Sequence, residues 1–166
     1  MMNIMESFGY KERAMEDRKL FLSKTKRAVD LNKKECVRCG FCCYQRPCVP
    51  TPNELFKIAK YLKMESKEMI NKYFLFEEIS GNKCIIPIKE SQEDIAGTFP
   101  DWMRSYDSGF CIFFDKEKKL CKIYKVRPKQ AKRTGCWKDY DTDSLSVMYT
   151  KEDFKKLGFD KDDIYE

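Results

Sequence analysis

Apolar residues recur at helical spacing between Lys11 and Leu31, a stretch without Gly or Pro that is rich in helix-forming residues. Pairs of apolar residues lie one heptad apart in this stretch, so the pattern predicts an amphipathic helix with a narrow apolar seam. The pairs are Ala14-Met15, Phe21-Leu22 and Ala28-Val29. We expect the seam to pack on the protein's own core, with docking to a partner as the alternative.

A second helix is predicted to begin at Thr51, where three local signals coincide. Thr51 can cap the helix, Pro52 suits its first position, and Glu54 completes a capping box. Ser66 is expected to cap a further helix soon afterwards. The apolar residues at helical spacing are Leu55, Ile58, Ala59 and Leu62 in the first helix and Met69, Ile70, Tyr73 and Phe74 in the second.

Short apolar runs bounded by turn residues predict three strands. Gly81-Asn82 marks a turn before Cys84–Ile88, and the proline of that run should keep its strand at the edge of a small sheet. Phe110–Phe114 and Leu120–Tyr124 are expected to form a hairpin around the charged turn Asp115–Lys119. Each arm of this hairpin contributes one cysteine.

Two short helices are predicted in the last third of the chain. Arg127-Pro128 should open one that runs through Arg133 and stops at Gly135. Thr150 should cap the other in a variant of the capping box, and Gly158 should end it.

Together these elements predict an α+β fold, a small and mainly helical cysteine-rich domain with a short antiparallel hairpin, organised around a thiolate metal site. We expect an N-terminal amphipathic helix in residues 1–35, the metal-binding domain in residues 36–138 and an acidic helical segment in residues 139–166. At 166 residues the chain suits a single domain, because two separate cores would each be marginal.

Composition narrows the class of protein. Apolar residues make up 42% and charged residues 36%, which suits a folded domain with a very polar surface. No apolar run is long enough to span a membrane, and the first ten residues lack the features of a signal peptide, so we expect a cytoplasmic protein without a membrane partner. The net charge is +6, but basic and acidic residues are interleaved, so charge alone supports nucleic-acid binding only weakly.

The number and positions of the cysteines indicate that the protein binds a metal. The chain has nine cysteines and no histidine, and five of the nine fall between Cys36 and Cys48. In a reducing compartment such a cluster indicates a metal site rather than disulfides, and an odd number would leave one thiol over. The sequence therefore predicts a site built from thiolates alone.

Spacing within the cluster favours an iron–sulfur centre. Cys36, Cys39 and Cys42 form a CxxCxxC run typical of [4Fe–4S] proteins, in which a distant cysteine is the fourth ligand. Structural zinc sites more often pair two separate CxxC turns, and this chain has no second one. Cys43 directly follows Cys42, so their side chains diverge and one of them should serve another atom or pack as a buried thiol.

The remaining ligands must come from farther along the chain. We expect them among the hairpin cysteines and Cys136, whereas Cys84 should be a core thiol. Cys48 lies in a loop stiffened by prolines and is either a ligand or a buried thiol. The full set of candidate metal ligands is Cys36, Cys39, Cys42, Cys43, Cys48, Cys111, Cys121 and Cys136.

The order of these motifs resembles that of the CxxCxxCC family, small proteins for which zinc or iron chelation is the expected property. The matching features are Cys36-x-x-Cys39-x-x-Cys42-Cys43, Thr51–Leu55, Cys111-Ile-Phe-Phe and Cys121-Lys-Ile-Tyr124-Lys-Val-Arg127-Pro128. The resemblance spans about residues 36–136 and implies cysteine-bound metal. Enzymes that methylate flagellin lysines look similar in this pattern. The family pattern places a cysteine where this chain has Ala131, and Cys136 is a candidate replacement.

Three functions are compatible with these observations. The first is an iron–sulfur protein for electron transfer, or accessory to a larger enzyme, with a redox or enzyme partner. The second is a structural zinc module that binds protein or nucleic acid through basic residues and the rings of Trp102, Tyr124 and Trp137. The third, a methyltransferase-type enzyme, lacks a Gly-rich nucleotide loop and a histidine base, so we do not expect autonomous catalysis. A reactive CxxC oxidoreductase is disfavoured further, since the run precedes a proline-rich loop.

Overall fold

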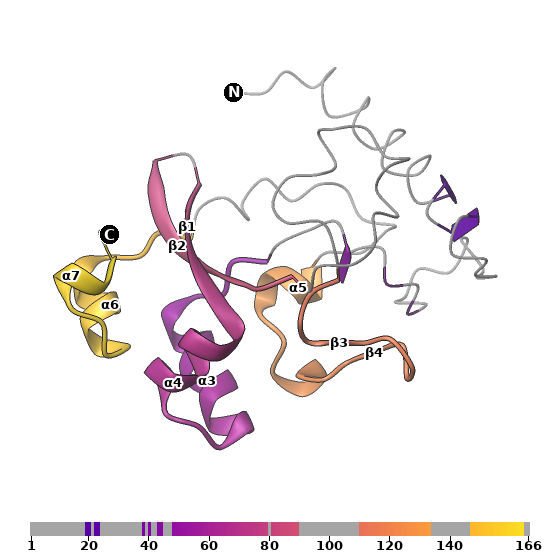
Figure 1. Cartoon of the computed structure of the whole chain (residues 1–166), viewed down its shortest axis with the longest axis horizontal. Coiled ribbons are helices and arrows are strands. Elements are labelled where there is room, and N and C mark those ends of the chain that lie inside the picture. Colours follow the sequence, from indigo (N-terminus) through magenta and orange to yellow (C-terminus); the bar gives the residue numbers. More distant parts are fainter. Residues whose placement is uncertain are drawn as a thin grey trace. The chain divides into compact units, whose positions relative to one another are not determined.

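The computed structural model describes residues 19, 20, 22, 23, 38, 40, 43, 44, 48–79, 81–89, 110–133 and 147–164. In chain order its elements are α3 (Pro52–Leu62), α4 (Ser66–Tyr73), β1 (Phe74–Ile79), β2 (Asn82–Pro87), β3 (Phe114–Asp115), β4 (Leu120–Cys121), the 3₁₀ helix η3 (Tyr124–Val126), α5 (Lys129–Arg133), α6 (Lys151–Lys156) and α7 (Lys161–Ile164) (Figure 1). Residues 19, 20, 22 and 23 are helical. The rest of the helix predicted over residues 11–31 lies outside the described residues.

The chain divides into two compact units. The first comprises Met1–Arg46, Lys89–Leu120 and Arg133–Asp141, and the second comprises Pro47–Ile88, Cys121–Lys132 and Thr142–Glu166. The described helices and the two antiparallel hairpins agree with the predicted α+β class. The domain boundaries predicted after residues 35 and 138, and a thiolate site as the organising centre, stay predictions. None of the described helices is both long and apolar enough to cross a bilayer.

Helix α3 begins at the capping box that the sequence predicts. The Thr51 hydroxyl accepts a hydrogen bond from the Glu54 amide at 3.2 Å, and the Glu54 carboxylate accepts one from the Thr51 amide at 2.8 Å. These bonds satisfy amides that have no partner within the helix. The other carboxylate oxygen of Glu54 accepts from the Lys129 amide at 2.7 Å. Glu54 therefore fixes the start of α3 and holds the start of α5 against it.

Replacing Glu54 with alanine should lower the free energy of unfolding by more than replacing Thr51 with alanine does. Loss of the Thr51 cap costs about 1 kcal/mol, whereas loss of the carboxylate removes hydrogen bonds to two backbone amides at once. Urea denaturation followed by circular dichroism measures both variants. Glu65→Ala is the matched control, because the side chain at the start of α4 makes no capping hydrogen bond. A loss as large in the control as in Glu54→Ala would contradict this account.

The prediction that Ser66 caps α4 is wrong by one residue. The capping position is Glu65, whose extended backbone presents a carbonyl that accepts from the Met69 amide at 2.9 Å. The chain leaves α3 through Lys63 in the left-handed conformation, with φ of 56°. Helix α4 therefore begins at Ser66, which lies in its first turn and does not cap it.

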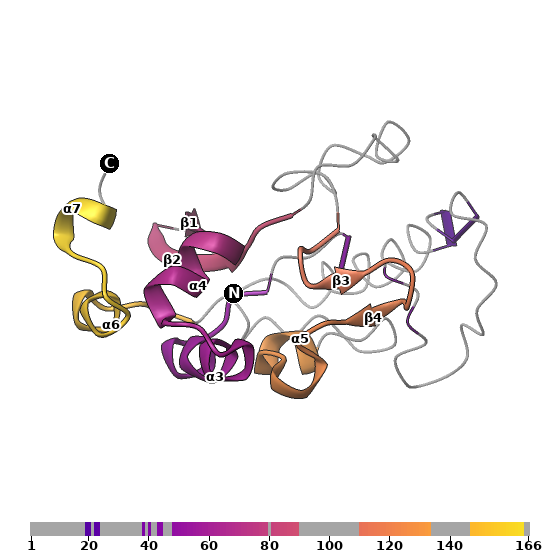
Figure 2. The same ribbon diagram turned by 60° about the horizontal axis from the view of Figure 1, so that its bottom comes forward.

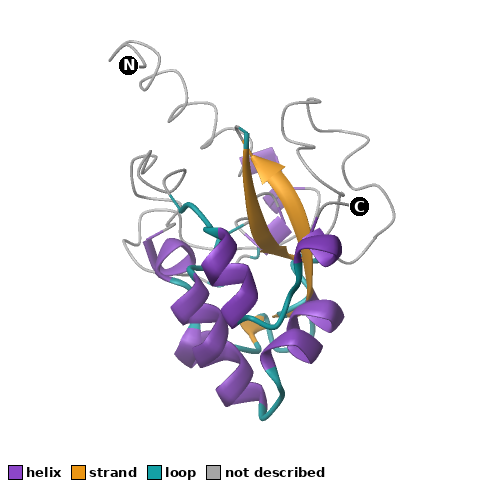
Figure 3. Cartoon of the chain, turned by 90° about the vertical axis from the view of Figure 1, so that its left-hand side faces the viewer, coloured by secondary structure: helices purple, strands orange, loops and turns teal. Residues whose placement is uncertain are grey.

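Strands β1 and β2 form an antiparallel hairpin, with Phe74 opposite Pro87 and Ile79 opposite Asn82 (Figure 3). The sequence predicts β2 and its turn, where Gly81 has φ of +79°. It misses β1, because Phe74 lies four residues after Ile70 and so fits the helical pattern. The helix instead ends at Tyr73, and Phe74 is extended with φ of −131°. The run of large apolar residues before the glycine turn was the available signal for a strand.

The hairpin predicted over residues 110–124 is present but much shorter. Its paired residues are those of β3 and β4 only. The Phe114 amide donates to the Cys111 carbonyl at 2.8 Å and bends the first arm into a turn. The second arm is cut short by η3, which begins at Tyr124. The charged turn is as expected, and Asp115 stabilises it by accepting two backbone amides at 3.0 Å.

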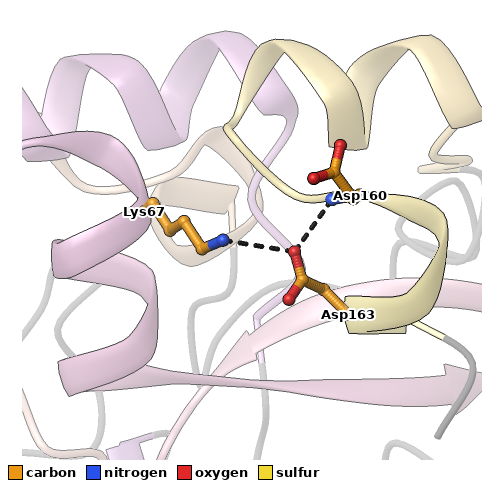
Figure 4. Close-up of polar contacts among 3 residues, drawn as sticks. All are labelled: Lys67, Asp160 and Asp163. Carbon is orange, nitrogen blue, oxygen red and sulfur yellow. Dashed lines mark hydrogen bonds and ion pairs between the residues drawn. The ribbon is translucent and has the colours of Figure 1, made fainter.

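The C-terminal segment folds into two helices, of which the sequence predicts the first. Thr150 and Asp153 form the expected capping box of α6, and Gly158 takes a φ of +91° just after the helix. Helix α7 was not predicted. Asp163 in α7 accepts from Lys67 Nζ at 3.2 Å and from the Asp160 amide at 2.9 Å (Figure 4). These two bonds, the backbone one first, lower the pKa of the Asp163 carboxyl.

The core of the second unit joins the helices to the β1–β2 hairpin. Side chains with at most 1% exposure include Leu55, Ile58, Met69, Ile70, Ile85, Ile86 and Leu157. Helices α6 and α7 lie beside the hairpin (Figure 1). The Phe76 ring of β1 lies 5.0 Å from the Phe159 ring and 5.8 Å from the Phe154 ring, measured between centroids. Lys83 of β2 donates to the Ile164 carbonyl at 2.6 Å. Burial of these apolar groups is the main stabilising contribution.

Candidate metal centre

Cys43 and Cys111 are brought together by the backbone of the first unit. The Cys111 amide donates to the Cys43 carbonyl at 2.7 Å. Both side chains are half-buried. The end of the CxxCxxCC run therefore lies against the segment that carries the first hairpin cysteine. The sequence predicts Cys111 as a remote ligand for a site that begins at Cys36, and this role stays a prediction.

Aromatic packing fixes the position of Cys111. The Tyr44 ring meets the Phe110 ring edge to face at 5.2 Å, and the Phe110 and Phe114 rings stack at 4.8 Å. All three residues are buried, as is Phe113. Neighbouring rings in such arrangements add to the stabilisation that burial provides. These buried rings, next in sequence to Cys43 and Cys111, thus pack the two segments against each other.

A buried lysine lies beside the two cysteines. Lys89 is only 8% exposed, its backbone pairs with Cys111 in an antiparallel bridge, and its ammonium group donates to the Tyr44 carbonyl. A buried cation must be compensated by nearby polar or negative groups. Several thiolates around one metal carry net negative charge, which an ammonium group would offset. The sequence did not single out Lys89, because one lysine among many has no distinguishing local pattern.

The other predicted ligands are distributed over the rest of the chain. Cys48 and Cys121 are half-buried and belong to the second unit. Cys36, Cys39, Cys42 and Cys136 lie outside the described residues. Within the described ranges no three Cys, Asp or Glu side chains converge as metal ligands do. Ala131, where the family pattern has a cysteine, lies in α5 and is half-buried.

Comparison with known proteins identifies the family. The model of the CxxCxxCC family, described as "Putative zinc- or iron-chelating domain", matches residues 35–156. The chain belongs to this family. Membership confirms the resemblance deduced from the cysteine run and supports metal binding, and the family description covers zinc and iron alike.

One curated relative of this CxxCxxCC protein is "Uncharacterized protein MJ0661" from Methanocaldococcus jannaschii. The two are 41% identical over 93 residues, which make up 56% of this chain and 39% of that protein. The match therefore spans well under half of the relative's length. No solved structure matches the chain.

A half-buried tyrosine holds the loop after the cysteine run of the CxxCxxCC domain. The Tyr149 hydroxyl donates to the Pro50 carbonyl. Burial, with smaller effects from Cys84, Glu54 and Cys48, raises the pKa of Tyr149 well above its usual value. On the same loop the Val49 amide donates to Gln130 Oε1 at 2.5 Å. The residues next to Cys48 are thus held by both α5 and the C-terminal segment, and no local sequence signal marked either contact.

Cys84 is a core thiol of the CxxCxxCC domain, as the sequence predicts. It is 2% exposed, and its Sγ donates to the Glu77 carbonyl at 3.5 Å. Burial, followed by the charge of Glu77, raises the pKa of the Cys84 thiol to about 11. Metal ligands and nucleophiles need the thiolate, so the environment of Cys84 suits neither role.

Alkylation should show how strongly the folded protein protects the Cys84 thiol. At pH 8 we expect iodoacetamide to modify Cys84 at least about a hundredfold more slowly in the folded protein than in urea, because both burial and the small thiolate fraction protect it. Mass spectrometry of peptides after timed quenching measures the rate. Equal rates in the folded and unfolded protein would contradict the assignment of Cys84 to the core.

The raised pKa of Cys84 predicts that the protein loses stability at alkaline pH. The folded protein retains the Cys84 proton up to a pKa of about 11, whereas the unfolded chain releases it near 9.0. The stabilisation is therefore complete below pH 9 and is lost as the pH rises toward 11. Urea denaturation of the wild type and of Cys84→Ala between pH 8 and 11 measures this effect, and the wild type should show the steeper decline. Parallel declines would contradict the prediction.

Proposed function

We propose that this protein carries an iron–sulfur cluster, most simply [4Fe–4S], and serves in electron transfer or as an accessory to a larger enzyme in the cytoplasm. Cys36, Cys39 and either Cys42 or Cys43 would supply three ligands. The fourth would come from Cys111, with Cys121 and Cys136 as the other candidates. The observation that carries the proposal is the backbone hydrogen bond that places Cys111 beside the end of the CxxCxxCC run.

The residues present fit such a group. The sequence offers sulfur donors and no histidine, which suits a cluster held by thiolates. Lys89, whose backbone pairs with Cys111, directs a buried ammonium group to the carbonyl of Tyr44, the residue after Cys43, and the rings of Tyr44 and Phe110 are buried beside it. Charge, hydrogen bonding and solvent exposure are the protein's means of setting a cluster potential. When bound, the cluster would supply reversible one-electron transfer.

A structural zinc module is the second candidate. Four thiolates from this set would form a closed tetrahedral site without a position for substrate. The family description, which includes zinc, supports this alternative. In that case the metal would hold the chain in shape, and the function would lie in binding a protein or nucleic-acid partner through the exposed surface.

Metal and sulfide analysis of the full chain distinguishes the two candidates. The protein should be purified without oxygen, and its visible spectrum recorded before and after addition of dithionite. We expect a brown protein whose visible absorption bleaches on reduction and which contains iron and acid-labile sulfide in equal amounts. A colourless protein with zinc and no sulfide would overturn the iron–sulfur proposal in favour of the zinc module.

A further inference from the structure

Two segments of the second unit are rich in basic residues and poor in acidic ones. Lys122–Lys132 contains five basic residues and no acidic one. Helix α3 and its C-cap add Lys57, Lys60 and Lys63, and their sequence has one acidic residue, Glu54. Both carboxylate oxygens of Glu54 accept backbone amides. The other described acidic residues of this unit lie outside these two segments: Glu65 and Glu68 at the start of α4, Glu77 and Glu78 on β1, and Glu152, Asp153, Asp160, Asp162 and Asp163 in the C-terminal segment.

The two basic segments adjoin each other in space. Helix η3 packs on α3, and the Glu54 carboxylate holds the first amide of α5 at 2.7 Å. Figure 2 shows α5 alongside α3. The lysines of both segments are exposed. The exposed lysines Lys57, Lys122, Lys125 and Lys129 define a surface that is here called the basic face.

Two tyrosine rings are exposed on the basic face. Tyr61 of α3 is 43% exposed and Tyr124 of η3 is 47% exposed. Tyr61 lies seven residues after Glu54, so it is on the side of α3 that meets α5. Both rings thus lie among lysines rather than in the core. Aromatic rings interspersed with cations are the combination that binds nucleobases and their phosphates.

The Tyr124 ring is held in place by an arginine. The Arg127 guanidinium lies 3.8 Å from the centre of that ring. Its Nε atom is buried and makes no hydrogen bond to any described residue. Packing, rather than hydrogen bonding at Nε, therefore keeps the guanidinium against the ring, where it gains a cation–π attraction. One face of Tyr124 is occupied in this way, and the exposed remainder can stack against a flat ligand.

We propose that the basic face binds single-stranded nucleic acid. Lysines spread over two adjoining elements can neutralise phosphates along a strand, and exposed tyrosines can stack on unpaired bases. An acidic protein partner would explain the lysines but not the two exposed rings. The proposal is independent of which metal the cysteines hold.

Fluorescence anisotropy on the full chain tests the proposal. The probes are labelled oligouridine and oligothymidine of about 12 nucleotides, which is within the site size of small single-strand binding folds. We expect both to bind at low salt, with log affinity falling by about 0.7 per log unit of salt for each phosphate contacted. Tighter binding of oligouridine would identify RNA as the ligand, and tighter binding of oligothymidine would identify DNA. Binding of neither probe would overturn the proposal.

Charge-reversal variants distinguish binding at the basic face from general electrostatic attraction to the protein. Lys122→Glu combined with Lys125→Glu should weaken binding at least about tenfold. The matched control, Lys151→Glu combined with Lys155→Glu on α6, should change it less than about twofold because those lysines lie among acidic residues. Equal weakening by both pairs, or equal competition by poly-glutamate, would overturn the proposal.

A second pair of variants tests stacking. Tyr124→Ala should weaken binding about tenfold. Tyr124→Phe should bind about as tightly as the wild type, because the ring is kept. Unchanged binding of Tyr124→Ala would overturn the role of the ring and with it the single-strand proposal. The metal content of every variant should match that of the wild type. Loss of nucleic-acid binding can therefore be told apart from loss of the metal site.

Discussion

Replacing Cys111 with serine is expected to abolish or severely reduce metal binding. A serine hydroxyl is not deprotonated at neutral pH and is a poor ligand for iron or zinc, so the site would lose the ligand that we propose for Cys111, the residue whose amide bonds to Cys43. Metal binding contributes to folding where the site forms only in the folded chain, so we also expect a lower midpoint of urea denaturation. Metal per chain after anaerobic purification is the primary measurement.

Cys84→Ser is the matched control for this experiment. It makes the same chemical change at a buried thiol and should retain the full metal content, although a hydroxyl in this apolar position should reduce stability. Cys39→Ser, within the CxxCxxC run, should lose metal as Cys111→Ser does. Retention of metal in Cys111→Ser would remove that cysteine from the ligand set, and Cys121 and Cys136 would be the remaining candidates.

Replacing Phe154 with alanine should destabilise the second unit by roughly 3–5 kcal/mol, the usual cost of removing a buried aromatic side chain. Phe154 is 4% exposed, and its ring lies 5.3 Å from the Tyr149 ring and 5.8 Å from the Phe76 ring. The substitution leaves a cavity between the hairpin and the C-terminal segment. Such a loss is a large part of the 5–15 kcal/mol by which a typical domain is stable.

Urea denaturation measures this effect, with Phe56→Ala as the control. Phe56 is 37% exposed on α3, so the same change there should cost much less. Similar losses in both variants would show that the aromatic contacts of Phe154 do not hold the C-terminal segment in place.

Local hydrogen-bonding patterns explain which parts of the fold were predicted. The two capping boxes, at Thr51 and Thr150, need only residues three positions apart, so the sequence specifies them directly. Strand β1 depends on pairing with β2, and its first residue also fits the preceding helix. Long-range pairing of this kind overrides local periodicity, which is why the boundary at Phe74 was missed.

The candidate metal site likewise combines features that the local sequence predicts with features that depend on long-range contacts. Cysteine spacing alone indicated thiolate ligation and suggested Cys111 as a remote ligand. The role of Lys89 and the anchoring of Pro50 by Tyr149 depend on residues that meet only after folding. Such contacts leave no periodic pattern in the sequence. The basic face was hidden for a related reason, because its lysines come from α3 and from the segment around η3 and α5, which are far apart in the sequence.

The hydrogen bond between Cys43 and Cys111 also has a consequence for biosynthesis. The two residues are far apart along the chain, so the CxxCxxCC run leaves the ribosome well before Cys111 has been made. At about 5–20 residues per second the delay amounts to several seconds. During that time the first cysteines are accessible to oxidants and to other metals. A site completed by Cys111 can therefore be assembled only late in translation or after it, which favours delivery of the metal to a finished chain.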